Sequence, residues 1–573
     1  VNAPVVHLER ATDARFGEFA TNVAMRYAKA LGRSPLASAE ALAELLNTAD
    51  IPGLERAEFV APGFVNLYLA PAAKFAQVGL INEQGAAYGT NEHYSEERWV
   101  IEHTSPNPNK AMHLGHLRNN LVGMGIVRLL KASGAAVVSD CVYNDRGIAI
   151  AKVMYGYLAH MKKDDRTPTD LAYWFAHRDE WHTPESREQA PDRFVTECYV
   201  QAEADMPAAA TETLVRSLVV EWEAGAEQVW ALWETVLGFA YTGIDRTLER
   251  LGSHWDKVWY EHQHYQKGKQ YVEQGLERGV FARTEDGAVV TQLEERYGIP
   301  DTVVLKRDGT SLYITQDLAL TDLKRRTYGA DKLVWVVGPE QSLAFQQLFA
   351  VCEQLGIGSR ADFTHVTYGY VGLKNASGAF QKMSSRAGTV VLIDDVIDTV
   401  KGVIHERLVE HESHEAEASE RLAEIMALAA VKFAFLRSDR TQDLSFDLEQ
   451  SVDVQGDSGV YVLYTYVRTQ SVLRKATVTD VPAGPETLGE EAGVLRTLLY
   501  YPAVIEKATN ELSVHHVAQY LLELASEFNR WYAKETFLDG TDREAYRVAI
   551  VRAVGQTLEN GLSILGIETV DEI

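Results

Sequence analysis

The sequence predicts an α/β protein: a doubly wound parallel-sheet (Rossmann-like) domain, with a small α+β domain before it and an all-α bundle after it. Strand-like and helix-like patterns alternate between about residues 95 and 395, as in doubly wound sheets. A Trp- and Glu-rich stretch of helical pattern interrupts the alternation from about 159 to 251, and we expect it to be an insertion. From about residue 397, Ala, Leu, Glu and Arg recur at helical spacing. The expected domains are 1–92, 93–396 and 397–573.

The N-terminal region contains signals for two helices and two strands. Residues 20–31 have a helical pattern that Gly32 is expected to end. Ser34-Pro35 is expected to cap and begin a second helix, which runs to about Leu46. Residues 58–69 form two strand-like runs around a Pro-Gly turn. The region is therefore expected to form a small α+β domain.

Length and composition indicate a globular protein. The 573 residues are enough for three or four domains, and 46% hydrophobic and 24% charged residues are ordinary values. No apolar run reaches the roughly 18–20 residues that span a bilayer, and the N-terminus has no signal-peptide pattern. The three cysteines are far apart, which argues against a disulfide framework or a Cys-x-x-Cys zinc site. We expect a cytoplasmic protein with no membrane partner.

The charge balance is acidic. The net charge of −26 and the pI of about 5.1, taken alone, argue against a nucleic-acid partner. Net charge does not describe local patches, however, and a large acidic protein can bind RNA through one basic face. We expect any RNA binding to be selective and sensitive to salt.

Residues 104–118, Thr-Ser-Pro-Asn-Pro-Asn-Lys-Ala-Met-His-Leu-Gly-His-Leu-Arg, carry the strongest functional signal. They follow the apolar run Trp99–Ile101, which predicts a buried strand, and they lead into a helical pattern. A loop between a strand and a helix N-terminus is a natural phosphate cradle. His113 and His116 lie one helical turn apart, and both rings can donate hydrogen bonds to phosphate oxygens. Gly115 would let a flat base approach the backbone closely.

Two other interpretations stay open for this segment alone: a capped surface helix with two solvated histidines, and a zinc site built on His-x-x-His. A second motif favours nucleotide binding. Residues 380–386, Phe-Gln-Lys-Met-Ser-Ser-Arg, lie just before the apolar run 390–393. In this order, the early His-x-Gly-His and the late Lys-Met-Ser resemble the paired HIGH and KMSKS signatures of class I aminoacyl-tRNA synthetases.

Within that class, the chain resembles the arginyl-tRNA synthetase family over most of its length. Residues 259–269, 308–319 and 337–341 carry this resemblance at matching order and spacing. Residues 20–25 and 61–66 are similar to the family's N-terminal domain, which touches the outer corner of tRNA. The resemblance also includes residues 143–148, 456–468, 528–532 and 561–567.

The resemblance implies ATP-dependent ligation of L-arginine to the 3′ end of its tRNA through an arginyl-adenylate, with release of AMP and pyrophosphate. The implied cofactors are ATP and Mg²⁺, and the implied partners are arginine and the tRNA for arginine. The implied catalytic residues are Lys110, His113, His116 and Lys382, and the implied ATP contacts are Gly115, Met383 and Ser384. The implied arginine contacts are Ser105, Asn107, Glu261, Tyr313, Asp317 and Gln341. The implied tRNA contacts are Tyr464 and Arg468, and no protein ligand to a metal is implied.

The residue types fit an arginine pocket. Tyr313 and Asp317 are four residues apart, so on a helix they share a face. A carboxylate can hold a guanidinium through two parallel hydrogen bonds, and Glu261 would supply a second carboxylate from another wall of the pocket. Two neighbouring carboxylates repel each other unless a cation lies between them. For each residue alone, a surface position is the ordinary interpretation, but together they match the family.

Two positions depart from the family pattern. Ser385 stands where the second lysine of KMSKS is usual, and Lys110 resembles the lysine thought to substitute for it. Cys141 stands four residues before Asp145, where the family commonly has an asparagine that contacts arginine. A thiol is a much weaker hydrogen-bond partner. Either Asn144 takes over that contact, or the contact differs.

Rival functions predict other features. A non-catalytic tRNA-binding paralogue or scaffold is the main alternative, and it predicts damaged signatures. A cysteinyl-tRNA synthetase predicts a zinc pocket, which the cysteine spacing does not supply. A small-molecule adenylyltransferase leaves the flanking domains unexplained. In the C-terminal region, Tyr464 and Arg468 share a helix face that suits base stacking, although tyrosines in the core of a bundle are an equally good interpretation. We expect a monomer, and the resemblance implies that arginine activation needs tRNA.

Overall fold

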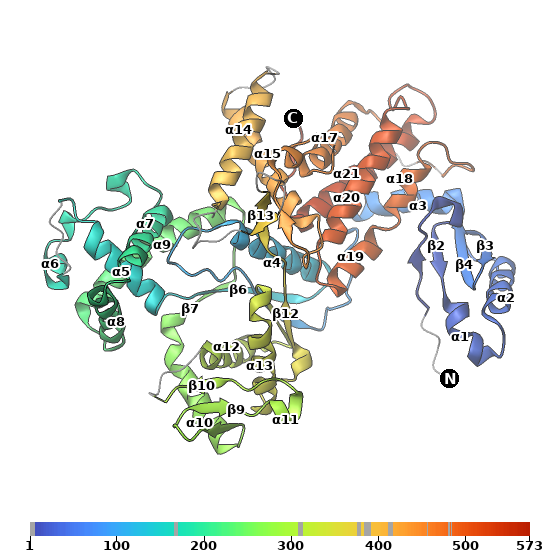
Figure 1. The fold of residues 1–573 in the computed structure, drawn as a ribbon. Helices are drawn as coiled ribbons and strands as arrows, with labels where there is room; N and C mark the ends of the chain where they lie inside the picture. Colours follow the sequence, from blue (N-terminus) through green and yellow to red (C-terminus); the bar gives the residue numbers. More distant parts are fainter. Residues whose placement is uncertain are drawn as a thin grey trace. The chain divides into compact units, whose positions relative to one another are not determined.

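The computed structural model describes residues 6–164, 170–307, 313–374, 380–382, 391–410, 416–454, 456–478, 482 and 484–573 (Figure 1). The chain folds into two compact units. One contains residues 1–90, 450–511 and 516–573, and the other contains residues 91–449 and 512–515. Compact units need not coincide with domains, so the boundaries expected at 92/93 and 396/397 remain predictions.

The larger unit is built on a five-stranded parallel sheet in the order β12-β11-β5-β6-β7. The strands are β5 (Arg98–Glu102), β6 (Ala136–Tyr143), β7 (Lys257–Tyr260), β11 (Lys332–Val336) and β12 (Phe363–Val366). This sheet confirms the predicted doubly wound class. Strand order reverses at the central strand β5, so the segments after β5 and β11 border the crevice in which such sheets bind ligands.

Helices join the strands and cover the sheet (Figure 1). β5 leads into α4 (Leu114–Ala132), while α12 (Tyr313–Tyr328) precedes β11 and α13 (Ser342–Gln354) follows it. Between β7 and α12 lie α10 (Gly268–Glu277), α11 (Glu294–Tyr297) and an antiparallel sheet of β8 (Phe281–Arg283), β9 (Val289–Thr291) and β10 (Val303–Leu305). The core between sheet and helices contains Val100, Leu333, Leu348 and Val351, all almost fully buried.

Helices also fill the stretch between β6 and β7. They are α5 (Ile148–His160), α6 (Leu171–Ala176), α7 (Pro191–Asp205), α8 (Ala209–Glu223) and α9 (Glu227–Arg250). Trp174 and Trp181 are almost fully buried in a hydrophobic core that these helices form together. The tryptophans noted in the sequence therefore stabilise the helical segment itself, because a large aromatic side chain gains most from burial.

The larger unit ends in a short sheet and two long helices. The sheet has the order β14-β13-β15, with β13 (Val371–Lys374), β14 (Phe380–Lys382) and β15 (Leu444–Ser445). The helices are α14 (Ile393–Glu410) and α15 (Ala416–Leu436). The short α16 (Leu448–Ser451) follows.

The smaller unit combines both ends of the chain. Its sheet has the order β1-β2-β4-β3, with β1 (Glu9–Arg10), β2 (Phe19–Thr21), β3 (Leu54–Val60) and β4 (Phe64–Leu69). Its helices are α1 (Val23–Leu31), α2 (Pro35–Thr48), α3 (Pro71–Gln84), α17 (Gly459–Lys475), α18 (Ala492–Leu498), α19 (Tyr501–Asn510), α20 (His515–Tyr532) and α21 (Glu544–Leu565). The Asn82 amide donates a hydrogen bond to the Ala549 carbonyl (3.1 Å), and the Tyr88 hydroxyl donates to the Leu498 carbonyl (2.8 Å).

The local signals in the N-terminal region were mostly right. Gly32 ends α1 in the left-handed conformation (φ 64°), and the Ser34 hydroxyl caps α2 by accepting a hydrogen bond from the Ala37 amide. The two strand-like runs are β3 and β4. The start of the first helix was wrong: residues 19–21 form β2, because their backbone pairs with β4. Tertiary pairing overrides local helical pattern here.

Candidate active site

The loop after β5 has a strained backbone. Thr104 and Ser105 have φ angles of 72° and 35°, a region that non-glycine residues rarely adopt. Side chains of α4 hold this bend: the Asn119 carbonyl oxygen accepts from the Thr104 amide (2.6 Å), and the Asn120 amide donates to the Thr104 hydroxyl (3.1 Å). Such strain persists where the surroundings enforce it, often at functional sites. The Ser105 hydroxyl donates to Glu102 (3.0 Å) and accepts from the Val142 amide (3.1 Å).

The two histidines form the N-terminal cap of α4. His113 Nδ1 accepts a hydrogen bond from the Gly115 amide (3.1 Å), and His116 Nδ1 accepts from the His113 amide (3.1 Å). The ring centroids lie 3.9 Å apart. Because each Nδ1 accepts, a neutral ring carries its proton on Nε2. Both rings are half-buried, and neither is a freely solvated surface histidine.

Both histidines are uncharged near neutral pH. Burial, with a contribution from the Lys110 charge, lowers the pKa of His113 to about 4. Burial and then the neighbouring His113 lower the pKa of His116 well below its usual value. Burial also lowers the pKa of Lys110. The pair therefore presents two neutral Nε2–H donors at the start of a helix, which suits phosphate oxygens.

The backbone of the His motif contacts the segment that follows the Lys-Met-Ser motif. His113 and Leu392 form an isolated antiparallel bridge. The Leu114 amide donates to the Val391 carbonyl (3.2 Å), and the Ile393 amide donates to the Met112 carbonyl (3.1 Å). The segment that follows the Lys-Met-Ser motif is thus fixed beside the first histidine.

The Lys-Met-Ser motif itself is described only in part. Lys382 lies in β14, where it pairs with Gly372 of β13. Met383 and Ser384 lie outside the described residues, as do the side chains of Lys382 and Tyr313. Tyr313 is the first residue of α12.

Glu261 follows β7 and has two neighbours on one oxygen. The Gln316 amide, in the orientation that satisfies both its ends, donates to Glu261 Oε1 (2.9 Å) and accepts from Arg146 Nη1 (3.1 Å). Arg146 Nη1 itself lies 3.5 Å from Glu261 Oε1. Burial raises the pKa of Glu261 to about 7; Arg146 opposes this shift and the Asp145 charge adds to it.

Asp317 lies on α12, next to Gln316. Its side chain is exposed to solvent, although many protein atoms surround it. Desolvation by those atoms raises the pKa of Asp317 to about 7; the charges of Glu102 and Glu261 add to the shift, while Lys324 opposes it. Two coupled carboxylates with raised pKa values favour a bound cation, because a cation would stabilise both ionised forms.

Lys324, Glu102 and Asp140 form a buried ion network, and Glu102 links it to the Ser105 hydroxyl. The sequence did not lead us to expect this network. Lys324 Nζ lies 2.7 Å from Glu102 Oε2 and 2.9 Å from Asp140 Oδ1, and the Trp259 indole donates to Asp140 Oδ2 (2.8 Å). Burial alone would lower the pKa of Lys324, but the two carboxylates outweigh it and raise the pKa. A signal was present: Lys324 lies seven residues after Asp317, on the same face of α12.

The remaining predicted residues are in different surroundings. Asn107 is exposed in the loop, and Gln341 ends the turn after β11. Cys141 is fully buried; burial raises the pKa of its thiol well above the usual value, and a hydrogen bond with the Ser105 backbone opposes that shift. Tyr464 is half-buried on α17, and the exposed Arg468 lies 5.0 Å from the centre of the Tyr532 ring.

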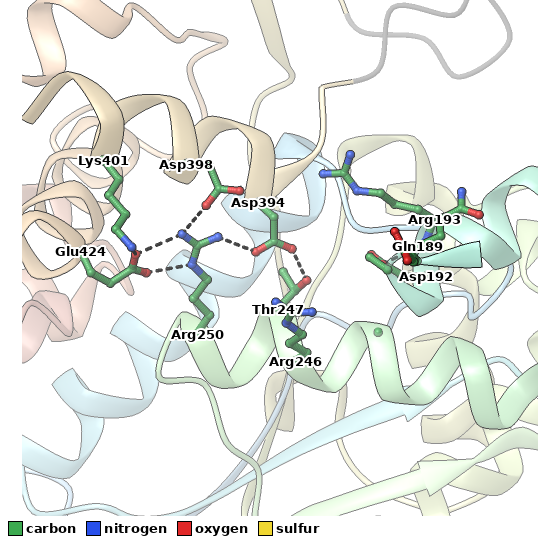
Figure 2. Close-up of a pocket in the computed structure, with 13 residues that line it drawn as sticks. Gln189, Asp192, Arg193, Arg246, Thr247, Arg250, Asp394, Asp398, Lys401 and Glu424 are labelled. Carbon is green, nitrogen blue, oxygen red and sulfur yellow. Dashed lines mark hydrogen bonds and ion pairs between the residues drawn. The ribbon is translucent and has the colours of Figure 1, made fainter. Parts of the chain in front are cut away.

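A separate cavity of about 750 Å³ lies among α7, α9, α14 and α15 (Figure 2). None of the predicted site residues lines it. Its most connected side chain is Arg250, which pairs with Asp394 (2.9 Å), Asp398 (2.6 Å) and Glu424 (2.8 Å). The Thr247 hydroxyl donates to Asp394 as well (2.5 Å). These contacts fasten the first turns of α14 to α9.

Replacing Arg250 by glutamine should destabilise the larger unit. The Arg250 side chain is 21% exposed, and its loss leaves Asp394 and Asp398 without this cation, while Glu424 keeps only Lys401 (3.2 Å). We expect a cost of about 2 kcal/mol, below that of a fully buried pair, and a melting midpoint lower by roughly 4 °C. Arg246→Gln is the control in differential scanning calorimetry, because Arg246 lines the same cavity and forms no ion pair with residues of known placement. If both substitutions lowered the melting midpoint equally, the stabilising role of the Arg250 ion pairs would be contradicted.

In the parts of the chain that are described, no helix is long and apolar enough to cross a membrane. Within those same parts, no group of three or more His, Cys, Asp or Glu side chains is arranged to hold a metal ion.

Comparison with known proteins covers the whole chain. The family of "tRNA synthetases class I (R), catalytic domain" matches residues 78–448, the "DALR anticodon binding domain" matches 462–573, and the "Arginyl tRNA synthetase N terminal domain" matches 2–69. The arginine–tRNA ligase of Bacteroides fragilis YCH46 is 32% identical over 100% of this chain and 96% of that protein. That of Amoebophilus asiaticus is 34% identical over 89% of this chain and 86% of its own length.

Solved structures agree in fold. The arginyl-tRNA synthetase of Thermus thermophilus superposes with a TM-score of 0.81 at 22% identity, covering 100% of this chain and 97% of that one. The arginyl-tRNA synthetase of Plasmodium falciparum gives a TM-score of 0.77 at 17% identity, covering 100% of this chain and 95% of that one.

The parallel sheet and the paired signature motifs define a class I aminoacyl-tRNA synthetase. Two comparisons identify the family within this class: the family match over residues 78–448 and the 32% identity to a curated relative along the full length. The chain belongs to the arginyl-tRNA synthetase family. Its activity is that of an arginine–tRNA ligase, which uses ATP to join arginine to tRNA.

Proposed function

We propose that this chain forms arginyl-adenylate with the residues gathered around β5, β7 and α12, and then transfers arginine to the 3′ end of the tRNA for arginine. One arrangement carries the proposal: Gln316 of α12 donates a hydrogen bond to Glu261 at the end of β7, and Asp317 is the next residue of α12, so two carboxylates lie around one site. The raised pKa values of both carboxylates agree with this arrangement. A guanidinium meets that charge arrangement better than an ammonium, because it is planar and can bind both carboxylates. Tyr313 and Gln341 complete the pocket, and Ser105 and Asn107 hold the amino-acid end.

The first step is a displacement at phosphorus. An arginine carboxylate oxygen forms a bond to the α-phosphorus of ATP, and the bond from that phosphorus to the bridging oxygen breaks, so that pyrophosphate leaves. His113 and His116 donate Nε2–H bonds to phosphate oxygens, and Gly115 contacts the adenine. Lys110 and Lys382 stabilise charge on the leaving pyrophosphate, and Met383 and Ser384 contact ATP. Positioning and charge stabilisation are the main requirements of such a step.

We propose that Mg²⁺ binds to the chain as a complex with ATP. The histidines are neutral, so they donate hydrogen bonds without neutralising phosphate charge. Mg²⁺ bound to phosphate oxygens would supply that charge, in keeping with its preference for oxygen ligands and retained waters. We assign it no protein ligand.

In the second step, a ribose hydroxyl at the tRNA 3′ end attacks the carbonyl carbon of the adenylate, and AMP leaves. Tyr464 and Arg468 are proposed to stack on unpaired anticodon bases, since aromatic and arginine side chains suit that contact.

We also propose that the chain acts as a monomer in the cytoplasm, and that its domains are 1–92, 93–396 and 397–573. Sedimentation of the free chain and its tRNA complex tests the monomer.

The deciding experiment is ATP–pyrophosphate exchange with arginine, with and without the tRNA for arginine, using lysine and cysteine as control substrates. Exchange with arginine but not with lysine or cysteine supports the proposal, if EDTA abolishes the exchange and Mg²⁺ restores it. Exchange that needs tRNA would add the expected coupling between RNA binding and activation. Absence of exchange from folded chain that still binds tRNA would favour the non-catalytic scaffold.

Gly115→Ala should slow exchange by disturbing His113. A Cβ on residue 115 would lie 2.9 Å from His113 Cε1 and 3.1 Å from Nδ1, so the ring has to move. We expect kcat/KM for ATP to fall at least tenfold, since small misplacements of catalytic groups are costly, while arginine binding measured by calorimetry stays unchanged. Gly402→Ala in α14 is the control, because nothing lies within 4 Å of the added methyl group.

A further inference from the structure

An arginine of the chain itself lies against the proposed arginine pocket. We propose that Arg146 is a positioning residue that holds one oxygen of Glu261 and leaves its second oxygen for the guanidinium of the substrate. The inference deepens the proposed function and rests on it, because it takes Glu261 as an arginine contact.

The contacts of Glu261 are one-sided. Arg146 Nη1 lies 3.5 Å from Glu261 Oε1, and the Gln316 amide donates a hydrogen bond to the same oxygen (2.9 Å). Among the residues whose placement is described, none donates a hydrogen bond to Oε2. A carboxylate can accept about four hydrogen bonds over its two oxygens. Glu261 therefore retains acceptor capacity for a ligand while its first oxygen is fixed.

Arg146 is held in place by groups outside the pocket. Its guanidinium carbon lies 4.0 Å from the centre of the Tyr265 ring and 5.8 Å from that of Trp222, and it forms an ion pair with Glu223 of α8. The side chain is 12% exposed. Stacking and ion pairing together restrain a guanidinium, because its planar fork satisfies both at once. This anchoring makes Arg146 a fixed charge that shares Glu261, and argues against a mobile side chain that competes with the substrate.

The charges around Glu261 explain why it needs this neighbour. The loop after β6 contributes Asp145 and Arg146, α12 contributes Gln316 and Asp317, and His262 is paired with Asp145 (2.6 Å). Without Arg146, Glu261 would face two carboxylates and no directly paired cation. Its protonated form would then be favoured further, since like charges and burial both oppose ionisation.

The consequence is a specific pH effect on arginine binding. Glu261 must be ionised to bind a guanidinium, so arginine affinity increases as pH rises through its pKa. Removal of Arg146 moves this increase to higher pH. A substitution that merely loosened the fold would weaken binding at every pH and would lower kcat as well.

The test measures arginine binding to the full chain by calorimetry from pH 6 to 9, together with KM and kcat in the exchange assay. For Arg146→Gln we expect 10- to 100-fold weaker binding at pH 7, recovery to within about threefold of wild type at pH 9, and unchanged KM for ATP. Arg146→Lys keeps the charge and loses the planar stack, so its loss should be smaller and its pH profile closer to that of wild type.

The control is Glu223→Gln, which removes the other ion-pair partner of Arg146 and leaves the pocket side intact; binding should change less than threefold. Tighter arginine binding by Arg146→Gln, or a loss that is equal at all pH values, would overturn the inference. Glu261→Gln distinguishes an error in the proposed pocket from an error in the role of Arg146. If Glu261→Gln leaves arginine binding unchanged, the proposed pocket is wrong; if it abolishes binding while Arg146→Gln has no effect, the inference about Arg146 is wrong.

Discussion

Asp317→Asn is expected to weaken arginine binding by about 30-fold or more, with ATP binding unchanged. The substitution keeps the size of the side chain and removes its charge, so a bound guanidinium would lose one of two carboxylate partners. Truncating one side of such a pair costs about 2–5 kcal/mol, which corresponds to factors from about 30 to several thousand. The measurement is calorimetric titration with arginine and, separately, with ATP.

The same titration has a pH signature. The pKa values of Asp317 and Glu261 are about 7 in the ligand-free chain, so both carboxylates are partly protonated at neutral pH. Arginine binding should release protons near pH 7 and become tighter from pH 6 to 8; Asp317→Asn should release fewer. Asp322→Asn is the control on the same helix, since Asp322 is already paired with Arg326 (2.8 Å). Proton release that is unaffected by Asp317→Asn would refute the assignment.

His116→Asn is expected to reduce kcat of the exchange reaction by about 10²–10³, the usual effect of losing one preorganised donor. An asparagine oxygen can replace Nδ1 as the acceptor for the His113 amide, which keeps the helix cap, but no group replaces Nε2–H. His116→Gln gives the converse: its amide reaches the Nε2 position, and the hydrogen bond that the His113 amide donates to residue 116 is lost.

The two variants should therefore separate the roles of the ring. We expect His116→Asn to melt within about 2 °C of wild type and to be nearly inactive, and His116→Gln to retain more activity with a lower melting midpoint. The measurements are exchange kinetics and scanning calorimetry under one buffer condition. If His116→Asn retained full kcat, the donor role of His116 would be excluded.

Much of the fold could be predicted because its signals are local. Gly32 and Ser34 act through the backbone of their own neighbours, and their helix-ending and capping roles were confirmed. His113 and His116 were expected to share a helix face, and their rings are in contact. The alternation of strands and helices gave the parallel sheet for the same reason, since each element carries its own periodicity.

The parts that escaped prediction depend on distant partners. Lys324 is buried between Glu102 and Asp140, which lie 222 and 184 residues away along the chain. Its position on the Asp317 face of α12 could be read from the sequence, but its two carboxylate partners could not. The bridge between His113 and Leu392 has the same origin. The roles of the predicted arginine, ATP and tRNA contacts remain predictions, because they concern molecules that the chain itself does not contain.

The smaller unit is made from the two ends of the chain, and this has a consequence for biosynthesis. α3 presents Phe75, Val78 and Ile81 to helices that include α21, where the Phe75 and Tyr546 rings lie 4.7 Å apart. At the roughly 5–20 residues per second of translation, α21 emerges about 20–90 seconds after α3. During most of that interval the apolar face of α3 lacks both of its helical partners, α18 and α21, while the whole parallel sheet is completed. The nascent chain is therefore exposed to aggregation at α3 until α18 and α21 have been made.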